Sequence, residues 1–141
     1  MLSILHPPAD TRQAERGLHA AWWALRVAIG ATALVAGLDK FFNLLTEWSM
    51  YLAPWVEQAS PIAPATLMRA VGVVEIAAGV LVLTRFTRVG AYLVAAWLAL
   101  VAVQLVTTGA FLDLATRDLV MAIAAFTLAK LTEWRDSEMT A

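Results

Sequence analysis

Four long apolar stretches dominate this chain, and their length leaves few folds open to it. They cover about residues 20–38, 65–83, 89–108 and 114–131. Each stretch holds close to the ~20 residues that an α-helix needs to cross ~30 Å of hydrocarbon. The third stretch has a single strongly polar residue, Gln104, so it lacks the polar face that a surface helix should have. The chain is therefore predicted to be all-α, a bundle of four transmembrane helices.

The composition supports a membrane protein and excludes several other classes. Of the 141 residues, 61% are hydrophobic and 15% are charged, whereas soluble domains have about 25% charged residues. A soluble chain of this size has too little interior to bury so much apolar surface. The net charge is −1 and no basic run is present, so no nucleic-acid partner is expected. Cysteine is absent, which excludes disulfides and thiol redox chemistry.

The segment between the first two stretches is expected to lie along the membrane boundary. It contains Trp48, Tyr51 and Trp55 together with several prolines, and Trp and Tyr favour the boundary between water and lipid. A short amphipathic helix is one form that it can take. Residues 1–19 and 132–141 are predicted to be tails outside the membrane domain, which covers residues 20–131. The start of the chain lacks the basic-then-apolar order of a signal peptide, so the first stretch is expected to be an uncleaved anchor.

The basic residues predict the orientation of the chain. With four spans, most of them fall on one side of the membrane: Arg12, Arg16, Arg85, Arg88, Lys130 and Arg135. The opposite side has Lys40, Arg69 and Arg117, and the last two lie partly inside their spans. Because positive loops stay in the cytoplasm, both termini are predicted to be cytoplasmic.

A first candidate site comprises ionisable residues on glycine-rich helix faces near mid-membrane. Small residues let helices approach closely in lipid, and the predicted packing residues are Gly30, Gly37, Gly72 and Gly79. Arg26 shares the face of the first two glycines and Glu75 that of the last two. Counting about 1.5 Å per residue puts Glu75 near the midplane and Arg26 about 5 Å towards the cytoplasm, within reach of its long side chain, which predicts an Arg26–Glu75 ion pair. Such a pair either fixes the register of the helices or handles a ligand or protons.

A second candidate site lies nearer the other surface. Its members come from all four predicted helices: Asp39, Lys40, Arg69, Gln104, Asp113, Arg117 and Asp118. If they converge, they line a vestibule that opens away from the cytoplasm. The adjacent Arg117 and Asp118 point about 100° apart on a helix, so the expected pairs are Arg69–Asp118 and Lys40 with Asp113 or Asp118. The alternative is that these charges reach out to the lipid headgroups.

Other sites are weakly indicated. His6 and His19 lie on the same side of the membrane, and neither suggests a ligand set for a metal or haem. No nucleophile–base pairing, phosphate loop or metal-ligand spacing is present. The chain therefore has no autonomous catalytic motif, no metal site and no intrinsic cofactor in its sequence.

The order of these motifs resembles the DoxX family of small four-helix bacterial membrane proteins. The similar segments are LRVAIGATALVAGLDKFF, VGVVEIAAGVLVLTRFTR and TRDLVMAIAAFTLA, and the resemblance covers about residues 25–131. It implies that the family's characteristic positions are Arg26, Gly30, Gly37, Lys40, Gly72, Glu75, Gly79, Arg117 and Asp118. It also implies the bacterial inner membrane as the location. The founding members resemble a subunit of a thiosulfate:quinone oxidoreductase, so a bound quinone or a lipid is the ligand that the resemblance suggests.

Three functions are consistent with this sequence. The first is an accessory subunit that packs into a larger membrane assembly, or into a homo-oligomer, with lipids around it. The second is a quinone-binding, redox-associated subunit that uses the Arg26/Glu75 pair. The third is a permease for protons or a small solute, which would need oligomerisation because four spans give little room for alternating access.

Overall fold

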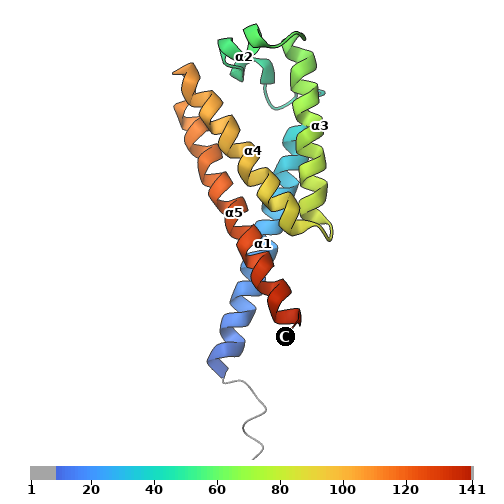
Figure 1. Cartoon of the computed structure of the whole chain (residues 1–141), viewed down its shortest axis with the longest axis vertical. Helices are drawn as coiled ribbons and strands as arrows, with labels where there is room; N and C mark the ends of the chain where they lie inside the picture. The colour runs from blue at the N-terminus through green and yellow to red at the C-terminus, as the bar shows by residue number, and fades with distance from the viewer. Residues whose placement is uncertain (1–8, 141) are drawn as a thin grey trace, which may run out of the picture.

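The described part of the protein forms four long helices and two short ones. The computed structural model describes residues 9–140, and no strand occurs among them. The elements are α1 (Ala9–Asp39), η2 (Trp48–Tyr51), α2 (Pro54–Ala59), α3 (Pro64–Leu83), α4 (Thr87–Thr108) and α5 (Leu112–Thr140). This all-α bundle confirms the predicted fold class, including the short helical segment between the first two long helices (Figure 1).

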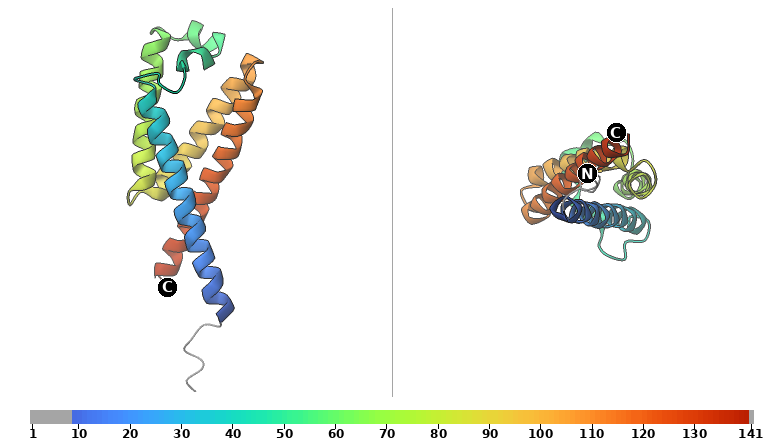
Figure 2. Two further views of the ribbon diagram at one scale, coloured as in Figure 1. Left: turned by 180° about the vertical axis from the view of Figure 1, so that it is seen from behind. Right: turned by 90° about the horizontal axis from the view of Figure 1, so that it is seen from below.

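The long helices form two antiparallel pairs that meet at one end and diverge at the other. α1 packs most extensively on α3, and α4 packs most extensively on α5. The start of α1 and the end of α5 lie at the same end of the molecule, and η2 and α2 lie at the opposite end (Figures 1 and 2). α3 and α4 approach closely beside the turn that joins them, where a Cβ on Gly90 would lie 2.5 Å from the nitrogen of Val82. Beyond this contact the α1/α3 pair and the α4/α5 pair diverge, so the bundle has a V shape.

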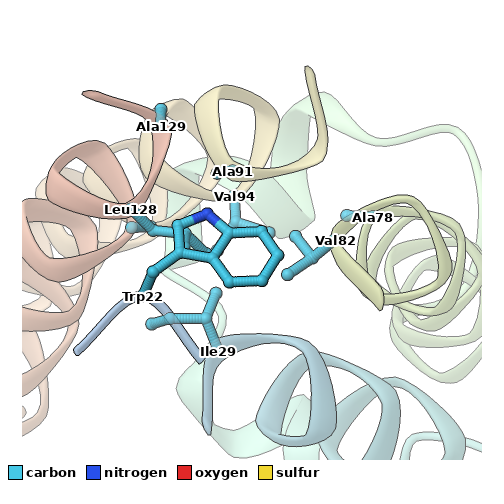
Figure 3. Close-up of a cluster of buried hydrophobic side chains, with 9 residues drawn as sticks. Trp22, Ile29, Ala78, Val82, Ala91, Val94, Leu128 and Ala129 are labelled. Carbon is cyan, nitrogen blue, oxygen red and sulfur yellow. The ribbon is translucent and has the colours of Figure 1, made fainter. Parts of the chain in front are cut away.

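A compact apolar core holds the two pairs together where they meet. Trp22 of α1 lies at its centre, and its indole N–H donates a 2.8 Å hydrogen bond to the hydroxyl of Thr132 on α5. The surrounding buried side chains come from all four long helices: Ile29, Ala78, Val82, Ala91, Val94, Ala125, Leu128 and Ala129 (Figure 3). Half of them are alanines, so the backbones approach closely around one large ring.

The outward faces of the helices are apolar. α1, α3 and α4 are each long and apolar enough to cross a membrane. Large hydrophobic side chains on these helices are exposed, among them Val35, Val73 and Val103. A monomer in water rarely exposes so large an apolar surface, whereas the hydrocarbon of a membrane accommodates it. α5 is long enough to span, yet Arg117, Asp118 and Lys130 interrupt its apolar sequence, so its place as a fourth span stays a prediction.

Two helices are longer than the apolar stretches within them. α1 begins at Ala9, well before the predicted start of its span, and α5 continues to Thr140. Both extensions are rich in charged residues, and the arginines and glutamates among them form helices readily. The predicted tails are therefore largely helical in the part of the chain that the structure describes, and His6 lies outside that part.

Candidate functional site

A cavity of about 460 Å³ lies between the two helix pairs at the open end of the bundle. Its walls come from α1, α3, α4 and α5, and the segment with η2 and α2 contributes further side chains. The lining is mainly aliphatic and aromatic, with a few polar groups: Thr32, Lys40, Thr46, Glu75, Gln104, Arg117 and Asp118. Thr32 and Arg117 are exposed as well as lining, so the cavity is open at its rim.

The polar centre of one wall is an ion pair between Lys40 and Glu75. The Lys40 ammonium lies 2.6 Å from Oε2 of Glu75, and the two side chains are 5% and 13% exposed. Lys40 follows the last residue of α1 and its side chain reaches back along α3 to the carboxylate. A single buried charge here would be costly, and pairing the two opposite charges offsets part of that cost.

Trp48 of η2 connects this ion pair to the loop after α1. Its ring lies over the Lys40 ammonium at 3.6 Å, a cation–π contact. Its indole N–H donates a 2.8 Å hydrogen bond to Oδ2 of Asp39. Asp39 also accepts the backbone N–H groups of Leu44 and Leu45, so this carboxylate organises the loop that ends α1. Asp39 is thus a structural residue beside the site.

The second oxygen of Glu75 has only a distant partner. The indole nitrogen of Trp97, on α4, lies 3.5 Å from Oε1 of Glu75, longer than the usual 2.7–3.2 Å for an N–H···O bond. Both groups line the cavity. This contact links α3 to α4 at the level of the cavity.

The segment between α1 and α3 bonds to the far side of the cavity. The side-chain amide of Gln104 on α4 donates a 2.8 Å hydrogen bond to the carbonyl of Tyr51. The indole N–H of Trp55 donates to the hydroxyl of Thr107, also at 2.8 Å. The ring of Tyr51 meets that of Phe111 edge-on with centroids 4.9 Å apart. The segment therefore forms a roof that joins the α1/α3 pair to the α4/α5 pair.

Some of the predicted outer residues converge, but with different partners. Lys40, Gln104, Arg117 and Asp118 line the same cavity, whereas Arg69 is exposed and outside it. The predicted Arg69–Asp118 pair is wrong, because the two helix pairs diverge at this level. Asp118 is buried and accepts two 3.1 Å hydrogen bonds from its neighbour Arg117. The flexible arginine side chain folds back to reach it, which overcomes the angular separation along the helix.

The predicted partners of Lys40 were also wrong. The ammonium binds Glu75, and neither Asp113 nor Asp118 contacts it. Asp113 is exposed in the first turn of α5. There its negative charge lies at the positive end of the helix dipole.

The predicted Arg26–Glu75 ion pair is wrong. The Arg26 guanidinium donates to the carbonyl oxygens of Val82, Leu83 and Thr84, at 3.0, 2.7 and 2.7 Å. These carbonyls close α3, whose last residues have no helical N–H partners. Arg26 lies at the closed end of the bundle and does not line the cavity. Its position follows from the antiparallel register, which places Arg26 at the end of α3 and Lys40 nearer its middle.

Glycines set that register. A Cβ on Gly37 would lie 2.7 Å from the carbonyl oxygen of Gly72, and one on Gly72 would lie 2.6 Å from that of Gly37. A Cβ on Gly79 would lie 3.0 Å from the carbonyl oxygen of Gly30. The two glycine pairs have the same spacing on both helices, so the backbones of α1 and α3 touch at both points. This contact positions Lys40 to reach Glu75.

Trp97 was not among the residues predicted from the sequence. The boundary position of Trp48, Tyr51 and Trp55 stays a prediction, and the structure adds that their side chains line the cavity. Trp97 lies near the middle of α4, away from the boundary where tryptophan usually occurs. A mid-span tryptophan in an otherwise aliphatic helix is a signal that could have marked this position.

The remaining candidates have local roles. The Nε2 atom of His19 accepts a hydrogen bond from the indole of Trp23, one turn further along α1. Within residues 9–140, no three His, Cys, Asp or Glu side chains lie close enough together to hold a metal ion.

Comparison with known proteins identifies the family. The DoxX family model matches residues 21–109, well over half of the chain. This range includes Lys40, Glu75, Trp97 and Gln104, and it ends before Arg117 and Asp118. No curated protein and no solved structure matches the chain. The match confirms the resemblance seen in the sequence, and the chain is a membrane protein that belongs to the DoxX family.

Proposed function

We propose that this protein binds a neutral, mostly apolar small molecule inside the membrane. The observation that carries the proposal is the cavity of about 460 Å³ at the open end of the bundle. Its volume lies within the ~300–1,000 Å³ that is common for small-molecule sites. An empty apolar cavity loses dispersion contacts on every wall, so a space that is open to lipid will be filled.

The charges around the cavity favour a neutral ligand. Each cation that lines it has an anionic partner: Lys40 with Glu75, and Arg117 with Asp118. A charged ligand would break one of these pairs and leave an ion without a partner in a poorly solvated site. The aromatic side chains in the walls favour a ligand with a flat ring, because ring stacking adds to apolar burial. A quinone or quinol headgroup has this chemistry.

The proposed location is the bacterial inner membrane with both termini in the cytoplasm. The basic residues support this orientation, because most of them lie at the end of the bundle where α1 starts and α5 ends. The cavity then faces the opposite leaflet, and its ligand would come from that leaflet or from the aqueous phase beyond it.

The test is an inventory of the apolar molecules that co-purify with the protein in mild detergent. Two matched variants sharpen it. Val101 lines the cavity, and Val103 is exposed on the outer face of the same helix. Val101→Trp fills the cavity, so it is expected to remove at least ~90% of the bound molecule, a loss equal to about 1.4 kcal/mol or more.

Val103→Trp adds the same side chain to the outer face and is expected to retain the molecule. Equal retention by both variants, or no co-purified molecule in the parent protein, would refute the proposal. Mass spectrometry of the organic extract gives the identity of the ligand without an assumed substrate.

The redox-associated, accessory and permease roles remain as alternatives to this proposal. A redox-associated role would use the Lys40–Glu75 pair at the cavity in place of Arg26 and Glu75. An accessory role in a larger assembly and a permease role stay predictions. A stable complex with a larger membrane protein that is unchanged in Val101→Trp would favour the accessory role. Flux into proteoliposomes that this variant abolishes would favour the permease.

A further inference from the structure

We infer that the ligand of this cavity is held by a hydroxyl group that hydrogen-bonds from the side to both Nε1 of Trp97 and Oε1 of Glu75, two atoms that lie 3.5 Å apart. The inference rests on the proposed function and narrows it to one class of ligand, an apolar molecule that carries a hydroxyl group. It starts from the unequal surroundings of the two oxygens of the Glu75 carboxylate.

One oxygen of Glu75 is well bonded, and the other is not. Oε2 accepts a 2.6 Å hydrogen bond from Lys40. Oε1 has the Trp97 indole nitrogen at 3.5 Å, beyond the usual range for a good N–H···O bond. An ionised carboxylate oxygen readily accepts two hydrogen bonds, and an indole N–H needs one acceptor. The cavity wall therefore presents one under-used acceptor beside one under-used donor.

Lys40 does not offer a better binding point. Its ammonium group points to three partners, which are Oε2 of Glu75, the carbonyl oxygen of Ala36 and the ring of Trp48. The contact with Ala36 is long, at 3.5 Å, but Glu75 already neutralises the ammonium, and the Lys40 side chain is only 5% exposed against 13% for Glu75. The polar group of a ligand therefore meets Glu75 and Trp97.

A hydroxyl is the group that matches this pair. It accepts a hydrogen bond from the Trp97 N–H and donates one to Oε1 of Glu75 in the same position. A ketone or an ether accepts from Trp97 but places its own lone pairs against the carboxylate. An amine cation would lie close to the Lys40 ammonium, and a carboxylate would be repelled by Glu75. Phenols, quinols and apolar alcohols remain as candidate ligands. Of the two hydrogen bonds that their hydroxyl makes, the one donated to the charged Oε1 is the stronger.

The experiment compares two probes of similar shape, 4-hexylphenol and 4-hexylanisole, by titration calorimetry on the full chain in lipid nanodiscs. Empty nanodiscs supply the correction for partition into lipid. The phenol is expected to bind at least about tenfold more tightly than the anisole, because a hydrogen bond to a charged acceptor has that effect. In Glu75→Gln the preference is expected to fall to about threefold or less, since the acceptor loses its charge.

Two further variants separate the causes. Asp113→Asn removes an exposed carboxylate from the first turn of α5, outside the cavity lining, and is expected to keep the tenfold preference. Trp97→Phe leaves the Lys40–Glu75 pair intact and removes the indole donor. It is expected to weaken both probes, because the ether oxygen also accepts from that donor. This variant keeps the inference testable if Glu75→Gln does not fold.

The outcomes distinguish the inference from the proposed function. Equal affinity for the two probes overturns the hydroxyl site and leaves the cavity as a binding site. A preference that survives in Glu75→Gln, or Trp97→Phe without effect on the phenol, also overturns it. If neither probe binds and no natural molecule co-purifies with the parent protein, the proposed function itself fails.

Discussion

Arg26 lies on α1 and Lys40 directly follows it, but the two side chains stabilise the protein in different ways. Arg26 binds the carbonyl oxygens that end α3, and Lys40 neutralises Glu75 at the cavity. The sequence predicted that both Arg26 and Glu75 lie in the membrane, and it failed on their pairing. The predicted depth in the membrane does not determine whether Arg26 or Lys40 pairs with Glu75. The register of α1 against α3 does determine it, and the equal spacing of the glycines on the two helices predicts that register.

Replacing Arg26 by Gln is expected to destabilise the protein without changing the ligand site. The variant loses the charge-assisted hydrogen bonds to the end of α3, which is worth about 1–3 kcal/mol. The free energy of unfolding in detergent, measured by denaturant titration, checks this value. Arg69→Gln is the matched control, because Arg69 is exposed, and it is expected to stay within about 0.5 kcal/mol of the parent. Loss of the co-purified ligand in Arg26→Gln at full stability would contradict this division of roles.

At the scale of elements, the contact between α1 and α3 depends on the absence of side chains at a few positions. Gly37 and Gly72 place their backbones against each other, and the sequence pattern indicated a packing face at these residues. The pairing of α4 with α5 was less visible. Its small residues are alanines that recur along both helices, and alanine patterns mark no single face.

Gly72→Ala is expected to lower stability, and Gly17→Ala to raise it. A Cβ at Gly72 would lie 2.6 Å from the carbonyl oxygen of Gly37, so the helices must separate, whereas Gly17 has no atom within 4 Å of that point. Overpacking of this kind costs about 1–3 kcal/mol. Alanine in place of an exposed helical glycine gains about 0.5–1 kcal/mol. Denaturant titration of both variants measures the difference, and equal stability would show that the close contact is absent.

A polar cluster joins α4 and α5 near the closed end and predicts a pH effect. The pKa of the Glu133 carboxyl lies below its ordinary value of 4.5, chiefly because Lys130 donates a hydrogen bond to it, with the Tyr92 hydroxyl as a second donor. The folded state favours the carboxylate, so this contribution to stability is present above pH 4.5 and is lost as the pH falls through the lowered pKa.

An NMR titration of the Glu133 carboxyl checks this prediction. The midpoint is expected below 4.5 in the parent protein, and Lys130→Met is expected to move it upward because the main donor is removed. A midpoint that does not respond to Lys130→Met would contradict the assigned cause.

At the scale of the whole molecule, the divergence of the two helix pairs creates the site. Helix number, helix order and the interfacial segment were predictable, since they follow from apolar length and breaking residues. The V shape was not, because the same periodicity fits a closed bundle. The roof over the cavity could not be predicted either. The hydrogen bonds of Trp55 with Thr107 and of Gln104 with Tyr51 join residues far apart in the sequence.

Single cysteines test the membrane topology, because the chain has no cysteine of its own. Gln13→Cys and Glu138→Cys are expected to be protected from an impermeant thiol reagent in intact cells, and Gln58→Cys to be labelled. All three positions are exposed. Labelling of Glu138→Cys alongside Gln58→Cys would mean that α5 does not cross the membrane, which leaves three spans.

An experimental structure of the protein in a lipidic mesophase tests the central claim most directly. We expect the α1/α3 and α4/α5 pairs to diverge as described, with non-protein density in the cavity beside Glu75 and Trp97. The predicted occupant has a polar end at Oε1 of Glu75 and an apolar body along the aromatic wall. A bundle with closed pairs, in which the protein's own side chains fill this space, would contradict the account.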